Sequence, residues 1–179
     1  VVDFTPEPLT QDVSFVFHIE KTADVVVDSL TAEISGIPST MELTTGLILA
    51  QKTYKLLFRP TYAALPSAAD SASAEALRCE ASVNIPGIVR SHTEDMVTGP
   101  GILQIAIYTH YDYEEEGTQR KAAKVFHAGI NLYHTLKERK SLQWDEEENG
   151  YRQASRSITV EIGSPLNIDK DGILNGGST

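Results

Sequence analysis

Cysteine is almost absent from this chain, which has Cys79 as the only cysteine among its 179 residues. A single cysteine excludes an internal disulfide. A chain of this length folds without one, because it can bury about two-thirds of the surface that it exposes when unfolded. Cys79 alternates in phase with Leu77, Ala81 and Val83. This spacing indicates a buried, small hydrophobic side chain rather than a reactive thiol.

Positive charge is also scarce. The chain has 15 lysines and arginines against 25 aspartates and glutamates, so its formal net charge is -10, and its pI lies near 4.9. This balance argues against nucleic acid binding, which needs a basic surface, and against adsorption to anionic lipid headgroups. We interpret the acidic charge mainly as a source of solubility.

Long hydrophobic runs are missing as well. No apolar stretch reaches the length of a transmembrane helix, and no segment has the pattern of a signal peptide. The sequence begins at Val1 without a methionine. We therefore expect it to be a piece of a longer chain, from which any targeting segment has been cut away.

Catalytic and metal-binding motifs are absent from the sequence. No serine lies in a G-x-S-x-G context, no histidine pair has H-E-x-x-H spacing, and there is no phosphate loop or dinucleotide fingerprint. Segment 167–172 begins like a calcium loop, but Ser178 stands where such a loop carries its bidentate acid, which favours a plain turn. His110 and His127 flank a predicted hairpin turn, and we expect a structural cross-strand pair. We expect a protein without enzymatic activity, cofactor or metal.

The sequence is rich in β-strand patterning. Its strongest run is 102–111, followed by an acidic turn at 112–117, a second strand at 124–129 and a short helix at 130–137. Apolar residues occupy both faces of the first of these strands, which predicts a central position in a sheet.

Other strands follow the same alternation. We predict them at 10–20, 24–35 (with a bulge near Asp28 and an end at Gly36-Ile37-Pro38), 41–49, 53–58, 77–85 and 151–162, with a short edge strand within 165–174. We expect a loop at 62–75, and a connection or short edge strand at 88–98. Seven to nine short strands and one short helix, without regular strand–helix alternation, predict an all-β sandwich that forms a single domain over residues 1–179.

Several short motifs together resemble one protein family. They are Phe4-Thr-Pro-Glu-Pro-Leu9 before a strand, Glu33-Ile-Ser-Gly-Ile-Pro-Ser39 leading into Met41-Glu-Leu-Thr-Thr-Gly46, Gly99-Pro-Gly-Ile-Leu-Gln104, Ala128-Gly-Ile-Asn-Leu-Tyr133 and Pro165-Leu-Asn-Ile168. This set is similar to the C-terminal half of fimbrillin-like lipoproteins of the Bacteroides group, which include FimB-like anchor and accessory subunits and related surface lipoproteins. The similarity extends over most of the chain, although each motif is short and none carries catalytic chemistry.

The resemblance implies a transthyretin-like Greek-key sandwich. It also implies that the chain is the C-terminal domain of a longer exported lipoprotein, held at the outer membrane and cell surface by a lipid anchor that precedes these residues. Family members are structural or adhesive, and some assemble pili by exchanging a β-strand between subunits. The expected partners are therefore pilus or envelope proteins that add a strand to an open sheet edge.

Two functional hypotheses follow. In the first, the chain is a non-enzymatic fimbrial accessory or anchor domain that binds partners through edge strands, which we expect at 9–20 and 157–168. In the second, it is a carbohydrate-binding module that uses exposed aromatic side chains as a sugar platform. Packing at the edge of the core is the favoured interpretation of these aromatics. The candidates for glycan contact are Trp144, Tyr151, Tyr111 and Tyr113.

Overall fold

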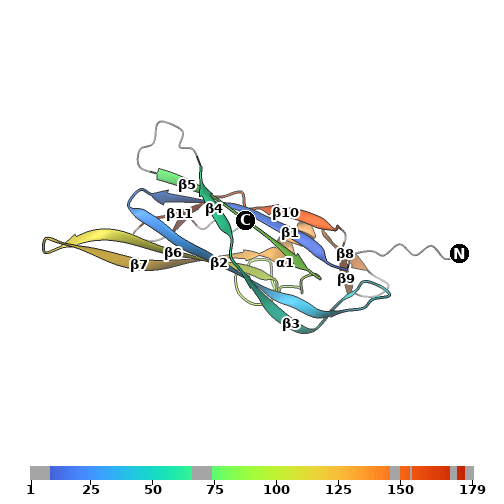
Figure 1. The fold of residues 1–179 in the computed structure, drawn as a ribbon. Helices are drawn as coiled ribbons and strands as arrows, with labels where there is room; N and C mark the ends of the chain where they lie inside the picture. Colours follow the sequence, from blue (N-terminus) through green and yellow to red (C-terminus); the bar gives the residue numbers. More distant parts are fainter. Residues whose placement is uncertain (1–8, 66–73, 146–149, 154, 170–172, 176–179) are drawn as a thin grey trace.

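Two β-sheets packed face to face form the body of the protein, and a short helix lies beside them (Figure 1). The computed structural model describes residues 9–65, 74–145, 150–153, 155–169 and 173–175. Within these residues, the predicted all-β class with one short helix is confirmed. The transthyretin-like strand order stays a prediction.

The larger sheet is built around the first strand that the structure describes. Its members are β1 (Gln11–Thr22), β4 (Thr61–Ala64), β5 (Ala74–Ile85), β10 (Ser157–Glu161), β11 (Leu166–Ile168) and β12 (Ile173–Asn175). β1 pairs antiparallel with β5 along its whole length. On its other side β1 pairs in parallel with β10 and then with β11, so it is bonded on both sides.

The smaller sheet has the strand order β3-β2-β6-β7, and all its pairs are antiparallel. These strands are β2 (Val25–Met41), β3 (Ile48–Phe58), β6 (Ile102–Glu115) and β7 (Thr118–Asn131). Helix α1 (Leu132–Glu138) follows β7 directly, and a separate pair of strands comprises β8 (Leu142–Asp145) and β9 (Gly150–Gln153).

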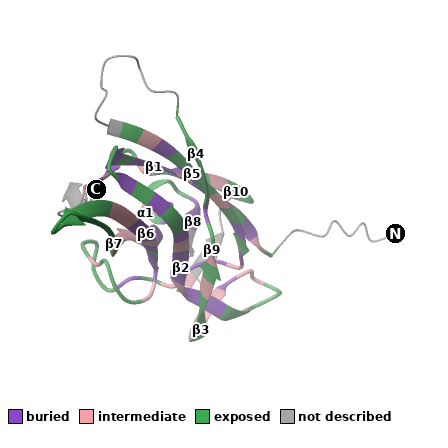
Figure 2. Ribbon diagram, turned by 60° about the vertical axis from the view of Figure 1, so that its left-hand side comes forward, coloured by how far each residue is buried: buried purple, intermediate pink, exposed green. Residues whose placement is uncertain are grey.

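The core lies between the two sheets and follows the alternation of the sequence. On β1 the inward residues Val13, Phe15, Phe17 and Ile19 are all buried, as the period of a half-buried strand requires. The ring of Phe15 stacks on Phe58 of β3, with centroids 5.9 Å apart. The buried positions of both sheets therefore form one continuous apolar layer (Figure 2).

Strand β6 has the central position that was predicted, between β2 and β7. Its inward side chains Leu103, Ile105 and Ile107 are buried. The reason given for the prediction was incomplete, however, because Tyr108 on the opposite face is 39% exposed. That face of the smaller sheet is open to solvent, as one face of an antiparallel sheet commonly is.

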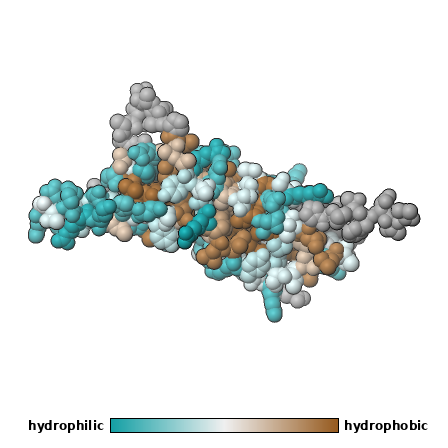
Figure 3. Space-filling model, viewed as in Figure 1, coloured by the Kyte–Doolittle hydropathy of each residue, from teal (hydrophilic) through white to brown (hydrophobic). Residues whose placement is uncertain are grey.

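The hairpin of β6 and β7 is longer than predicted. The acidic segment 112–117 is mostly strand, and the turn consists only of Glu116 and Gly117, both with positive φ (53° and 76°). Two positive φ values in a two-residue loop match the twist of the flanking strands. The hairpin therefore projects beyond the body of the sandwich, with hydrophilic side chains at its tip (Figures 1 and 3).

The predicted histidine pair does not form. In the hairpin register His110 lies opposite Ala123, and His127 lies opposite Ala106. His110 instead contacts Asp28, with 2.7 Å between Nδ1 and Oδ1. The prediction failed because the turn lies at Glu116 and Gly117, whereas His110 and His127 would face each other only if the turn lay two residues further along the chain.

Strand β2 contains the predicted bulge, since its register against β6 shifts between Val27 and Ser29. It does not end at residues 36–38, as predicted, but continues to Met41 with a second irregularity after Ile34. The strand can continue past Gly36 because glycine has no Cβ. A Cβ at this position would lie 2.6 Å from the backbone nitrogen of Gly101.

Several other boundaries also differ from prediction. Residues 42–47 form a turn closed by the bond from Gly46 N to Glu42 O (2.8 Å), not part of a strand. The predicted loop 62–75 contains β4 at one end and the start of β5 at the other, and 88–98 is a connection without a strand. The predicted strand 151–162 is divided into β9 and β10, and segment 165–174 contains two strands, β11 and β12. Residues 66–73 and 170–172, the latter in the calcium-like segment, lie outside the described residues.

The expectation of an edge strand is wrong for residues 9–20 and right for part of residues 157–168. Residues 9–20 do not form an edge, because β1 has β5 on one side and β10 and β11 on the other. Alternation shows which face of a strand is buried, but not which strands flank it. Within 157–168, β11 is covered by β12, whereas no described strand pairs with the outer side of β10.

The sandwich core predicts the behaviour of Cys79, whose side chain is completely buried. Burial raises the pKa of this thiol to about 12, so the reactive thiolate is suppressed in the folded state. We expect the native protein to resist a disulfide-exchange reagent at mildly alkaline pH, and the protein unfolded in guanidinium chloride to react fully. Absorbance of the released thiol measures both rates. Rapid reaction of the native protein would contradict the buried position.

Candidate functional site

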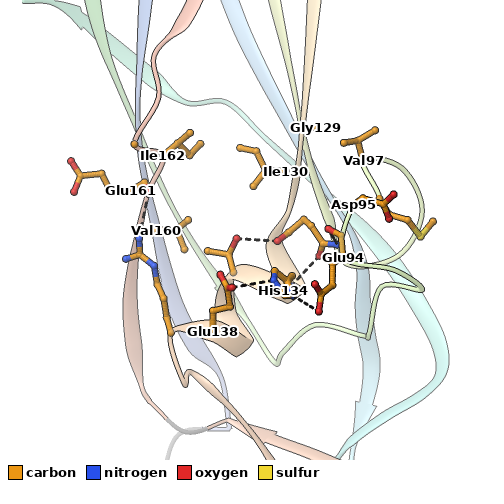
Figure 4. A pocket seen from close by; sticks show the side chains of 15 residues that line it. Glu94, Asp95, Val97, Gly129, Ile130, His134, Glu138, Val160, Glu161 and Ile162 are labelled. Atoms are coloured by element: carbon orange, nitrogen blue, oxygen red, sulfur yellow. Dashed lines mark hydrogen bonds and ion pairs between the residues drawn. The ribbon is translucent and has the colours of Figure 1, made fainter. Parts of the chain in front are cut away.

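A groove opens on the side of the sandwich where β7 and β10 are the outermost described strands of their sheets (Figure 4). Its walls are residues 94–97 of the loop before β6, 129–131 at the end of β7, the outer side of α1 with Arg139, and 160–163 at the end of β10. We call this hollow, with a volume of about 470 Å³, the β7–β10 groove.

The interior of the β7–β10 groove is apolar. Ile130 from β7 and Ile162 after β10 are half-buried and pack against the core, and Val160 is fully buried beneath them. Val97 adds an exposed apolar side chain from the loop. Apolar side chains thus reach the groove from both sheets, although these residues are far apart in the chain.

Gly129 holds the loop wall close to β7. A Cβ at this position would lie 2.7 Å from the carbonyl oxygen of Val97 and 2.9 Å from its Cβ. No side chain fits into that space, so glycine is needed for the close approach of the two backbones.

Asn131 ties the same loop to the start of α1. Its Oδ1 accepts a hydrogen bond from the backbone nitrogen of His134 (3.0 Å), which caps the helix. Its Nδ2 donates to Ser91 Oγ, to Thr93 O and to Glu94 O, at 3.0, 2.9 and 3.1 Å. One side chain therefore fixes both the helix and the loop that form two walls of the groove.

The groove has an acidic rim. Glu94 and Glu138 lie on either side of His134, with Oε1 atoms 3.8 Å from Nδ1 and 3.2 Å from Nε2. Asp95 accepts a hydrogen bond from Thr93 Oγ1 (2.7 Å). This bond, and to a smaller extent one from the backbone of Asp95 itself, lowers the pKa of the Asp95 carboxyl group. Glu161 contributes a further carboxylate to the rim. Arg139 is the only lysine or arginine among the lining residues.

The backbone of β10 presents hydrogen-bonding groups to the groove side. The bonds from Asp12 N to Arg156 O and from Ile162 N to Val16 O show that even-numbered residues of this segment bond to β1. The groups of Thr159 and Glu161 therefore point away from β1. Their carbonyl oxygens accept hydrogen bonds from Arg139, from Nη1 at 3.0 Å and Nη2 at 3.5 Å.

The aromatic residues predicted as glycan contacts lie elsewhere. Tyr111 and Tyr113 lie on β6, with ring centroids 6.2 Å apart and planes tilted by 50°. Trp144 is opposite Tyr151 in the β8–β9 pair, at the other end of the molecule from the hairpin tip (Figure 1). The four residues thus form two separate pairs, one of side chains and one in backbone register, and neither Tyr111 nor Tyr113 lines the groove.

The residues that form the groove were not identified by sequence reasoning. The only local signal at Arg139 is a positive charge just beyond the C-terminal end of the predicted helix, where the helix macrodipole favours a cation. Its contact with β10 joins residues twenty positions apart, and no sequence motif predicts such a contact. The alternation in 157–162 indicated a strand, but it carried no sign of an open outer side.

In the part of the chain that the structure describes, no three side chains of histidine, cysteine, aspartate or glutamate are grouped so that they could hold a metal ion. No described helix is both long enough and apolar enough to cross a membrane.

Gly129 provides a test of the loop wall. We expect Gly129→Ala to lower the free energy of unfolding by about 1–3 kcal/mol, because the added methyl group forces the backbone of Val97 away from β7. Gly163→Ala is the matched control, since a Cβ at that position meets nothing within 4 Å. Denaturant unfolding of the two variants measures the difference, and equal stabilities would contradict the close approach.

Asn131 provides a separate test of the loop tether. Asn131→Asp keeps the oxygen that caps α1 but removes the three Nδ2 donations, whereas Asn131→Ala removes both. We expect both variants to lose stability, Asn131→Ala by about 1–3 kcal/mol, and both to show faster amide hydrogen exchange at residues 93–97. If exchange in Asn131→Asp stays at the wild-type rate, the side chain is only a helix cap.

Comparisons of the chain with protein-family models, with curated proteins and with solved structures gave no match.

Proposed function

We propose that this chain is a non-enzymatic structural or adhesion domain that binds an extended segment of a partner protein by β-strand addition along β10. In this role it is similar to fimbrial accessory or anchor subunits. The single observation that carries the proposal is the open outer side of β10 directly beside the apolar β7–β10 groove. Strand addition uses backbone bonds for affinity and pockets for alternate side chains for specificity, and both features occur here.

The other sheet edges are less suited to a partner strand. β4 and β12 are only four and three residues long, and β3 has two breaks in its register against β2. β7 carries Lys121 and Lys124 along its length and is covered by the loop at Gly129. Short strands, irregular strands and lysines all discourage edge pairing. β10 is also short, but it borders the groove.

The charge of the groove selects the kind of partner. Glu94, Asp95, Glu138 and Glu161 line it, and the whole chain carries a formal net charge of -10. A second copy of this acidic chain would bring its own carboxylates against those of the groove, and the repulsion between like charges disfavours such self-association. The proposed occupant is therefore an extended segment of another protein in which apolar residues alternate with lysine or arginine.

The proposed location rests on the sequence resemblance alone. If the resemblance holds, the chain lies at the cell surface as the C-terminal domain of a lipid-anchored protein, and its partners are pilus or envelope subunits. An acidic surface and a groove that accepts an extended segment suit such a role. The carbohydrate-binding hypothesis stays a prediction, for which the Tyr111–Tyr113 pair is the described candidate platform.

A synthetic peptide tests the proposal. We expect a fluorescently labelled ten-residue peptide of alternating valine and lysine to bind the protein, with binding measured by anisotropy. A peptide with glutamate in place of lysine should bind much more weakly, because of the acidic rim. A peptide with proline at alternate positions should not bind, because proline has no backbone N–H to donate.

Variants of Thr159 locate the binding edge. Thr159→Pro removes an outward N–H of β10 and leaves the bonds to β1 in place, so we expect peptide binding to be lost while circular dichroism remains unchanged. Thr159→Val keeps the backbone N–H and serves as the matched control. Absence of peptide binding to the wild-type protein, or undiminished binding to a folded Thr159→Pro, would overturn the proposal.

A further inference from the structure

We infer that Arg139 is a displaceable cap on β10, and that an incoming partner strand must remove its guanidinium before it can pair. The inference rests on the proposed function, and it adds a control element to the same site. It is carried by the two hydrogen bonds from Arg139 to the outward carbonyl groups of β10.

The position of Arg139 is set by the helix before it. Leu132, Tyr133 and Leu136 of α1 are buried in the core, and the backbone nitrogen of Arg139 donates to Thr135 O at 3.1 Å. The base of the arginine side chain is therefore fixed. At the other end of its flexible stem, the guanidinium reaches β10, where Nη1 donates to Thr159 O and Nη2 donates to Glu161 O.

The guanidinium occupies the place of a neighbouring strand. A strand added to β10 would donate backbone N–H groups to the outward carbonyls of Thr159 and Glu161. Nη1 and Nη2 already donate to these two oxygens, at 3.0 and 3.5 Å. Arginine suits this position because its planar fork can donate to two acceptors at once. The cap thus satisfies two outward carbonyl groups of β10 while no partner is present.

The cap is weak enough to be displaced. Arg139 is solvent-exposed, and so are both of its bonds to β10. Water can solvate the guanidinium as soon as it leaves, and Glu138, Glu94 and Glu161 remain nearby as carboxylates. A contact of this kind lowers the affinity of a competing strand by about threefold to tenfold. It therefore biases β10 against weak, nonspecific pairing without blocking a well-matched segment.

A simpler explanation is that Arg139 acts only through its charge. Removing a cation from an acidic groove would by itself strengthen the binding of a cationic peptide. Lys137 separates the two explanations, because it is an exposed cation in the last turn of the same helix and does not line the groove. Lys137→Ala changes the net charge as Arg139→Ala does, but it leaves the bonds to β10 in place.

The experiment measures the affinity of the alternating valine–lysine peptide for four proteins: wild type, Arg139→Ala, Arg139→Lys and Lys137→Ala. We expect Arg139→Ala to bind about threefold to tenfold more tightly than wild type. Arg139→Lys should be intermediate, because an ammonium group lacks the planar fork, and Lys137→Ala should stay close to wild type. If Arg139→Ala does not fold, Arg139→Gln replaces it.

The outcomes separate the cap from the proposed function. Equal tightening in Arg139→Ala and Lys137→Ala would show a charge effect and overturn the cap. Equal binding by all four proteins would overturn the cap and leave strand addition standing. If no protein binds the peptide, strand addition fails and the cap, which rests on it, is overturned as well.

Discussion

The pairing of β1 on both sides is the constraint on which the rest of the structure depends. Its antiparallel bonds to β5 fix one half of the larger sheet, and its parallel bonds to β10 and β11 fix the other. Because the inward residues of β1 fill the centre of the core, a shift by one residue would turn all of them toward solvent. The register of β10, and hence which of its groups face the groove, follows from this strand.

Sequence reasoning succeeded where the cause of a structure is local. Alternation in β1 requires one buried face, and the slip in the alternation of β2 at Asp28 marks the bulge. It failed where the cause lies in contacts between distant segments. β2 continues through Gly36 because the backbone of Gly101 packs against it, and no signal at Gly36 itself distinguishes this continuation from an ending. The contact of Arg139 with β10 belongs to the same class.

The β7–β10 groove illustrates how an interaction surface can arise without catalytic chemistry. Its apolar floor comes from both sheets, its acidic rim from a loop, a helix and a strand, and its wall is secured by Asn131 and Gly129. Each part has an ordinary structural cause. What makes the combination suited to a partner is that no described strand pairs with the outer side of β10, where the side chain of Arg139 donates to two carbonyl groups.

The parallel pairing of β1 with β10 and β11 has a consequence for how the protein is made. Asp12 lies opposite Ser157, and Ile19 lies opposite Leu166, so β1 leaves the ribosome before all the other described strands and obtains its neighbours on one side only after β2 to β9 have been synthesised. Such nonlocal closure slows folding and leaves strand edges exposed meanwhile. During translation β1 therefore carries an open side, which a chaperone has time to recognise before the last strands arrive.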